Sequence, residues 1–166
     1  MRPILPAVVF FALAGVAANT QAGFKAASSD VIAPDLALVS AEFGTVKTAE
    51  DGTIEIIPAG NIPLVVGQTY GWRLHFRTTR NILALREELI LPAEPKEWGS
   101  DGEPEFKVSP DGKIAKTEGP VALTDGMIQH SWSVAPGDPS GGYEIRVFIE
   151  GQLVRTFKFK VEPPKP

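Results

Sequence analysis

The sequence contains no cysteine, which excludes a disulfide framework, a thiolate nucleophile, a zinc–thiolate site and an iron–sulfur cluster. Basic side chains are also scarce, since 16 Lys and Arg stand against 20 Asp and Glu and leave a net charge of −4. A general nucleic-acid-binding protein needs a basic surface to replace phosphate counterions, so this balance argues against nucleic acid as a partner. With 166 residues and 43% hydrophobic content, the chain is long enough for one compact domain and too hydrophobic for a disordered tail.

Only the N-terminus carries a long apolar run. Residues 1–22 contain a single charged side chain, Arg2, followed by an almost wholly apolar run from Ile4 to Ala18. This run is shorter than the ~20 residues of a membrane-spanning helix and is typical of a signal peptide. Small residues make cleavage after Ala18 or Ala22 plausible, and an uncleaved anchor is the alternative. We therefore expect export to the periplasm or beyond, with no membrane insertion after cleavage.

The remaining chain divides into three parts. Residues 23–35 are small and polar and end in Pro-Asp, which is typical of a linker. We expect one folded domain over residues 36–162, followed by a proline-rich tail over residues 163–166. The 16 glycines and 15 prolines indicate many turns.

The domain alternates apolar and polar residues with the period of β-strands. In Tyr70–Arg77, Tyr70, Trp72, Leu74 and Phe76 share one face, whereas helical spacing would scatter them. A second strand, Ile128–Val134, directs His130 and Trp132 inward. Further strands are expected at residues 36–46 (bent at Gly44), 53–57, 62–66, 105–108 and 113–123 (broken at Gly119-Pro120). Residues 81–91 favour a strand, with a short helix as the alternative.

The last two strands, at residues 141–149 and 152–161, predict a hairpin with a defined register. Their apolar residues occupy odd positions on both strands, and facing residues of an antiparallel pair share one side of the sheet. Odd residues must therefore pair with odd ones. A three-residue loop ending at a left-handed Gly151 achieves this and pairs Tyr143 with Phe157.

This terminal unit carries a resemblance to a known fold. APGDPSGGYEIRVFIEGQLVRTFKFKV (135–161) resembles the last hairpin of bacterial immunoglobulin-like modules. More narrowly, AEFG (41–44), IPLVVGQTYGWRLHF (62–76), LILP (89–92) and GGYEIRV (141–147) resemble a family of secreted bacterial proteins, domain of unknown function 3859.

The resemblance covers roughly residues 36–162 and implies an all-β fold, a single antiparallel immunoglobulin-like β-sandwich. With the strand pattern, it leads us to expect about seven to nine strands. It also implies a corner tyrosine at Tyr143, whose hydroxyl bonds back to the preceding loop. The family supplies no catalytic residues.

No catalytic or metal-binding motif is present. The nearest pattern, GDPSG at residues 137–141, has the wrong spacing for a nucleophile elbow and leads into a strand. The two histidines, His75 and His130, fall on opposite strand faces, which argues against a histidine metal site. We predict no catalytic residues, no metal and no cofactor. His130 is interpreted as an inward, hydrogen-bonded side chain rather than a general base.

Two features are candidates for binding. Arg73, His75 and Arg77 form a cationic stripe with neighbours about 7 Å apart on the outer face of one strand, and could hold an acidic glycan, a phosphate or a carboxylate. Cross-strand pairing with acidic residues is the alternative that we prefer. The acidic partners considered are Glu87, Glu88 and Glu144.

The second candidate is Trp98, in the proline-rich segment 92–112. An exposed tryptophan in a loop could stack on a sugar or anchor a protein contact, and packing against the end of the domain is the alternative. Taken together, the sequence predicts a non-enzymatic, exported binding or interaction module of the bacterial envelope, whose partner is an unknown protein or envelope polymer. The alternative is a carbohydrate- or envelope-polymer-binding module that uses Trp98 and the stripe; a hydrolase finds no supporting motif.

Overall fold

The computed structural model describes residues 30–50, 52–98 and 106–164, and within them the regular structure is entirely β. The expected signal peptide, residues 23–29 of the linker and the end of the tail lie outside the described residues. The strands are β1 (Asp30–Ala33), β2 (Leu36–Thr48), β3 (Ile54–Pro58), β4 (Asn61–Pro63), β5 (Thr69–Thr78), β6 (Ile82–Ile90), β7 (Lys107–Val108), β8 (Ile114–Ala122), β9 (Met127–Ser133), β10 (Gly141–Ile149) and β11 (Gln152–Glu162). No helix that could cross a membrane occurs in the part of the chain that the structure describes.

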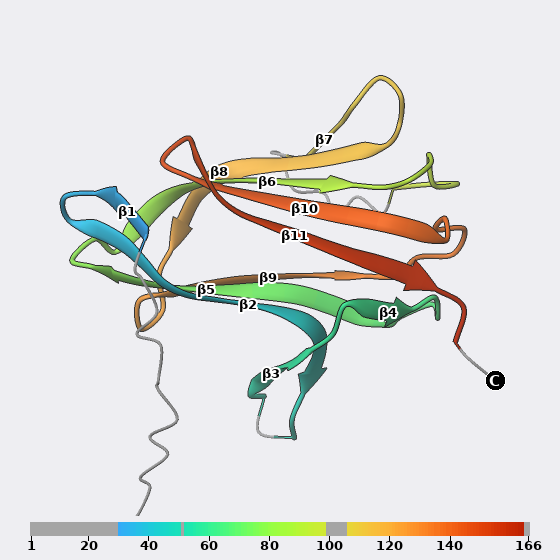
Figure 1. The fold of residues 1–166 in the computed structure, drawn as a ribbon, viewed down its shortest axis with the longest axis horizontal. Coiled ribbons are helices and arrows are strands. Elements are labelled where there is room, and N and C mark those ends of the chain that lie inside the picture. The colour runs from blue at the N-terminus through green and yellow to red at the C-terminus, as the bar shows by residue number, and fades with distance from the viewer. Residues whose placement is uncertain (1–29, 51, 99–105, 165–166) are drawn as a thin grey trace, which may run out of the picture.

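The strands form two sheets that stack as layers (Figure 1). One sheet has the order β1-β2-β5-β9, with β3 also paired to β2. The other has the order β4-β11-β10-β6-β8-β7. All pairs are antiparallel except β4–β11. The predicted all-β sandwich is confirmed; the short strands β1, β4 and β7 raise the number above the expected range.

The core lies between the layers. The alternation of β5 places Trp72, Leu74 and Phe76 inward, each at most 3% exposed. Aromatic contacts join the sheets, because Phe43 of β2 packs against Phe159 of β11 with tilted rings whose centroids are 4.6 Å apart. The predicted inward face of β5 is therefore confirmed.

The structure confirms one open prediction about the strands and corrects three others. The segment 81–91 forms a strand, as preferred over a helix. Asp30–Ala33, expected in the linker, instead pairs with β2. The strand expected at 62–66 extends only over β4. No break occurs in β8 at Pro120: β7 pairs only with residues 115 and 116, so Pro120 lies on an open edge, where its missing N–H leaves no ladder bond unmade.

The predicted three-residue hairpin loop is wrong. Ile149 pairs with Gln152, so the loop consists of Glu150 and Gly151 alone. Both have positive φ, 51° and 78°, as a type I′ turn requires. This turn matches the right-handed twist of the two strands, which explains why it is preferred over the longer loop.

The odd-with-odd pairing is nevertheless present. A β-bulge between Val147 and Phe148 shifts the register by one residue, so that Tyr143 faces Phe159 rather than Phe157. The change of parity that the apolar pattern demands is made inside the strand instead of in the loop.

Tyr143 is the corner tyrosine implied by the resemblance. It is 3% exposed, and its hydroxyl donates a hydrogen bond to the carbonyl oxygen of Pro139 at 2.8 Å. Burial raises the pKa of Tyr143, so the hydroxyl remains protonated as a donor.

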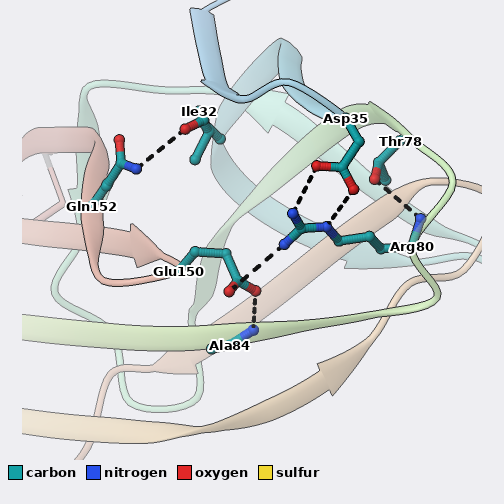
Figure 2. A network of polar contacts seen from close by, with 7 residues as sticks. All are labelled: Ile32, Asp35, Thr78, Arg80, Ala84, Glu150 and Gln152. Carbon is teal, nitrogen blue, oxygen red and sulfur yellow. Dashed lines mark hydrogen bonds and ion pairs between the residues drawn. The ribbon is translucent and has the colours of Figure 1, made fainter.

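A polar network joins three turns at one end of the sandwich (Figure 2). Arg80 donates two hydrogen bonds to Asp35, at 2.7 and 2.8 Å, and forms an ion pair with Glu150 at 3.7 Å. The hydrogen bond from Arg80 lowers the pKa of the Asp35 carboxyl. Glu150 also accepts a hydrogen bond from the backbone N–H of Ala84 at 2.9 Å. The β1–β2, β5–β6 and β10–β11 turns are thus held together.

Gly44 allows β3 to approach β2, and we expect Gly44→Ala to lower the free energy of unfolding by about 1–3 kcal/mol. A Cβ at this position would lie 1.9 Å from the carbonyl oxygen of Ile57, so the backbone of β3 must shift. Gly142→Ala is the matched control in β10, because nothing lies within 4 Å of its Cβ position. Urea unfolding of both variants measures the difference, and equal stabilities would contradict the close approach.

Candidate ligand-binding cleft

The sandwich is open along the seam between β8 and β9. β9 ends one sheet, and β8 is followed only by the two-residue β7 in the other. Figure 1 shows these strands in separate layers. A cleft of about 350 Å³ lies on this side, lined by residues from β5, β6, β8, β9, β10 and the segments that follow β6 and β9. This volume is at the lower end of those typical of small-molecule sites.

A row of aromatic rings lines the cleft. Trp98 and Phe106 have ring centroids 6.3 Å apart, and Phe106 and Trp132 have centroids 6.5 Å apart. All three side chains are partly buried against the core. Trp132, which the sequence pattern assigned to the core, is thus only half-buried, because β9 is an edge strand and the facing sheet does not cover it completely.

Hydrogen bonds engage both indole N–H groups. Trp98 Nε1 donates to the carbonyl oxygen of Gly112 at 2.8 Å, and Trp132 Nε1 donates to Glu87 Oε1 at 2.6 Å. The rings can therefore offer a ligand their faces and C–H edges rather than their N–H groups. Trp98 packs against the domain, as one of its two interpretations proposed.

Glu87 is the most unexpected residue of the site. Its side chain is 0% exposed, and its second oxygen, Oε2, lies 2.6 Å from His130 Nδ1. The Glu87 carboxylate, which belongs to β6 in one sheet, thus accepts hydrogen bonds from side chains of β9 in the other sheet. The prediction that His130 points inward and is hydrogen-bonded is confirmed.

The sequence analysis treated Glu87 as an outward partner of the cationic stripe, and this is wrong. β6 directs its odd-numbered residues inward, and Glu87 occupies one of those positions, between the buried Leu83 and Leu89. The same alternation that identified other strands was sufficient to find it. Sequence reasoning also missed Phe106 and Asp138 as residues of this cleft.

Apart from the imidazole of His130, the charged side chains around the cleft are acidic. Glu97 and Asp138 line it, and among the described lining residues there is no Lys or Arg. Asp138 Oδ2 accepts a hydrogen bond from the backbone N–H of Ala135 at 2.9 Å. Burial outweighs this bond and raises the pKa of the Asp138 carboxyl.

The cationic stripe lies elsewhere. Arg73, His75 and Arg77 project from the outer face of β5, opposite the core-facing residues of the same strand. Arg73 contacts Glu42 at 3.6 Å and donates to Gln129 Oε1 at 3.0 and 3.1 Å. The structure therefore does not join the stripe and Trp98 into one site.

Nor are Glu88 and Glu144 partners of this stripe. Both lie in the other sheet, where they form ion pairs with Arg146 at 4.0 and 2.5 Å. The stripe does have an acidic neighbour, Glu42, as expected. The sequence could not tell which acidic residues share a sheet with β5.

We expect reversal of charge at Arg73 to be more damaging than at Arg77. Arg73 also donates to the backbone carbonyl of Ile54 at 2.7 Å, so Arg73→Glu removes this contact and places a new carboxylate beside Glu42. The free energy of unfolding should fall by about 1–2 kcal/mol, and added salt should reduce the loss. Arg77→Glu, at an exposed position, should cost less than half as much. Equal losses in urea unfolding would contradict this assignment.

Comparisons with known proteins concern the fold. A family model described as the PM0630 beta sandwich domain matches residues 41–162. Among solved structures, an immunoglobulin-like protein from Pseudomonas aeruginosa is similar, with a TM-score of 0.50 and 19% sequence identity over 74% of this chain and 92% of that chain. At this identity the likeness shows the fold alone. No curated protein matches the sequence significantly.

Proposed function

Because the chain belongs to the PM0630 beta sandwich domain family, which is described by a fold and not by a reaction, we propose that it is a binding module whose ligand occupies the cleft between β8 and β9. One observation carries this proposal. A concave, aromatic-lined cleft of about 350 Å³ opens at the seam between the two sheets. Pockets with apolar and aromatic walls and a few polar groups are the usual form of small-molecule sites.

A non-enzymatic role is supported by the polar groups near the cleft, which form hydrogen bonds to other groups of the protein. Both oxygens of Glu87 hold neighbouring side chains, which suits a structural role. Ser140, the serine of the sequence pattern nearest to a nucleophile elbow, donates its hydroxyl to the carbonyl oxygen of Val161 at 3.1 Å. These groups support the shape of the cleft rather than a reaction.

A carbohydrate- or envelope-polymer-binding module is the second candidate. The row of Trp98, Phe106 and Trp132 supports it, because sugar rings pack their C–H faces on aromatic side chains. The cationic stripe does not contribute to this site, since it lies on the outer face of the other layer.

The proposed site can be tested by NMR with a panel of sugars, amines, carboxylates and short peptides. Three indole N–H signals are expected, one for each tryptophan, and single substitutions assign them. Ligands of the cleft should move the signals of Trp98 and Trp132 and leave that of the fully buried Trp72 in place. Ligands that bind without moving either cleft signal would overturn the location of the site.

We also propose that the protein is exported to the bacterial envelope. The apolar segment within residues 1–22 and the resemblance to domain of unknown function 3859 support this. N-terminal sequencing of protein from its native host should find a mature chain that begins at Asn19 or Gly23. Recovery of Met1 from the cytosolic fraction would contradict export.

A further inference from the structure

We propose that the ligand of the cleft is a small organic cation, in which an ammonium group carries alkyl substituents. The inference rests on the proposed function, because it names the ligand class of the same cleft. Three observations support it: the acidic charge of the lining, the partly buried Asp138 carboxylate that lacks an ion-pair partner among the described residues, and the two indole N–H groups that are already hydrogen-bonded.

Apart from the imidazole of His130, the side chains of the lining that carry charge are acidic. Glu97 and Asp138 contribute carboxylates, and Glu87 lies behind His130. Among the residues described, no Lys or Arg lines the cleft, and the side chain of Lys96 packs over Gly137 outside it. An anionic ligand would meet repulsion here, whereas a cation would be attracted.

Asp138 is a carboxylate that a cation would stabilise. Within the described residues it forms no ion pair, and it accepts a hydrogen bond from the backbone N–H of Ala135. Burial has removed part of its hydration without supplying a positive charge, which is why the pKa of its carboxyl is raised. A bound ammonium group would replace the lost hydration with a direct ion pair.

The aromatic side chains present π surface. The N–H groups of Trp98 and Trp132 are already donated to Gly112 and Glu87, so neither indole has its donor available for a ligand hydroxyl. The negative faces of aromatic rings attract alkylammonium groups, most strongly when water is excluded. Carboxylates that line the same cleft as such rings favour an organic cation over a neutral sugar.

The experiment compares two ligands that differ in one atom. Choline carries a quaternary nitrogen, and 3,3-dimethylbutan-1-ol replaces that nitrogen with carbon while keeping the same shape. Calorimetric titration of the purified protein should show binding of choline at least about fivefold tighter than binding of the neutral isostere. Equal affinities, or no binding of choline, would overturn the assignment of a cation.

Substitutions test whether the negative charge of Asp138 contributes to choline binding. Asp138→Asn should weaken choline binding about fivefold or more, although the amide oxygen can still accept from Ala135. Glu55→Gln is the control, because it makes the same change of charge at an exposed position on β3. If Asp138→Asn and Glu55→Gln have equal effects, the proposed contact is wrong.

A third variant tests the aromatic contact. Trp98→Leu should weaken choline binding while a thermal melt shows the protein still folded, because Trp98 lies at the margin of the core. A choline affinity that is unchanged in this variant would overturn the role of the ring. If neutral ligands move the Trp98 and Trp132 signals and choline does not compete with them, the assignment of a cationic ligand is wrong. The cleft would then still be the binding site.

Discussion

Replacing Glu87 by alanine is expected to lower the free energy of unfolding by about 3–4 kcal/mol. The substitution removes a fully buried carboxylate that accepts from Trp132 Nε1 and His130 Nδ1, each at 2.6 Å. Hydrogen bonds to charged acceptors are worth about 1.5–3 kcal/mol each, and the substitution deprives both donors of this acceptor. The contact also joins β6 to β9, so the seam beside the cleft should loosen. Urea unfolding and hydrogen exchange along β9 measure both effects.

The neighbouring Glu88 is a matched control. It has the same side chain on the same strand but faces outward, where it contacts Arg86 at 3.6 Å. Glu88→Ala should therefore cost about 1 kcal/mol or less. Glu87→Gln should be intermediate, because the amide offers one acceptor where the carboxylate offers two. If Glu88→Ala is as damaging as Glu87→Ala, the buried position of Glu87 is wrong.

Trp72→Ala should lower the free energy of unfolding by about 3–5 kcal/mol, because it empties the largest buried site of the core. Within the described residues, Trp72 Nε1 has no hydrogen-bond partner, so this loss comes from packing alone. Trp72→Phe, which keeps an aromatic ring, should cost about half as much. Denaturant unfolding monitored by circular dichroism gives the values.

The other tryptophans provide the comparison. Trp98 and Trp132 are only partly buried, so Trp98→Ala should cost about 1–2 kcal/mol and Trp132→Ala a value between those of Trp98 and Trp72. We expect Trp132→Ala to cost more than Trp98→Ala because it also removes the hydrogen bond to the buried Glu87. A series in which Trp98→Ala is the most damaging would contradict the core described here.

Local pattern alone determined most of the strands. The period-two alternation of Tyr70–Arg77 identified the inward face of β5, and the odd-numbered apolar residues of the last hairpin demanded odd-with-odd pairing. Such inferences succeed because alternation depends on the backbone, which directs successive side chains to opposite sides. The same rule, applied to β6, would have placed Glu87 inward, but a charged residue amid apolar ones was taken for a surface partner.

Tertiary structure decided how the last hairpin brings odd-numbered residues opposite odd-numbered residues. A type I′ turn with a bulge and a three-residue loop both satisfy the apolar pattern, and strand twist selects between them. It also decided that Arg73 contacts Glu42 and Gln129, because partners across a sheet depend on which strands are neighbours. Strand order is not encoded in local periodicity.

The cleft is likewise a property of the assembled sheets. Trp98 and Phe106, which follow β6, meet Trp132 of β9 because β9 ends one sheet and only the two-residue β7 lies beyond β8 in the other, which leaves the seam between them open. Alternation assigned Trp132 to the inner face correctly, but only the position of β9 at an edge exposes half of that face. A residue's side of a strand is therefore readable from the sequence, whereas its burial depends on what the opposite sheet covers.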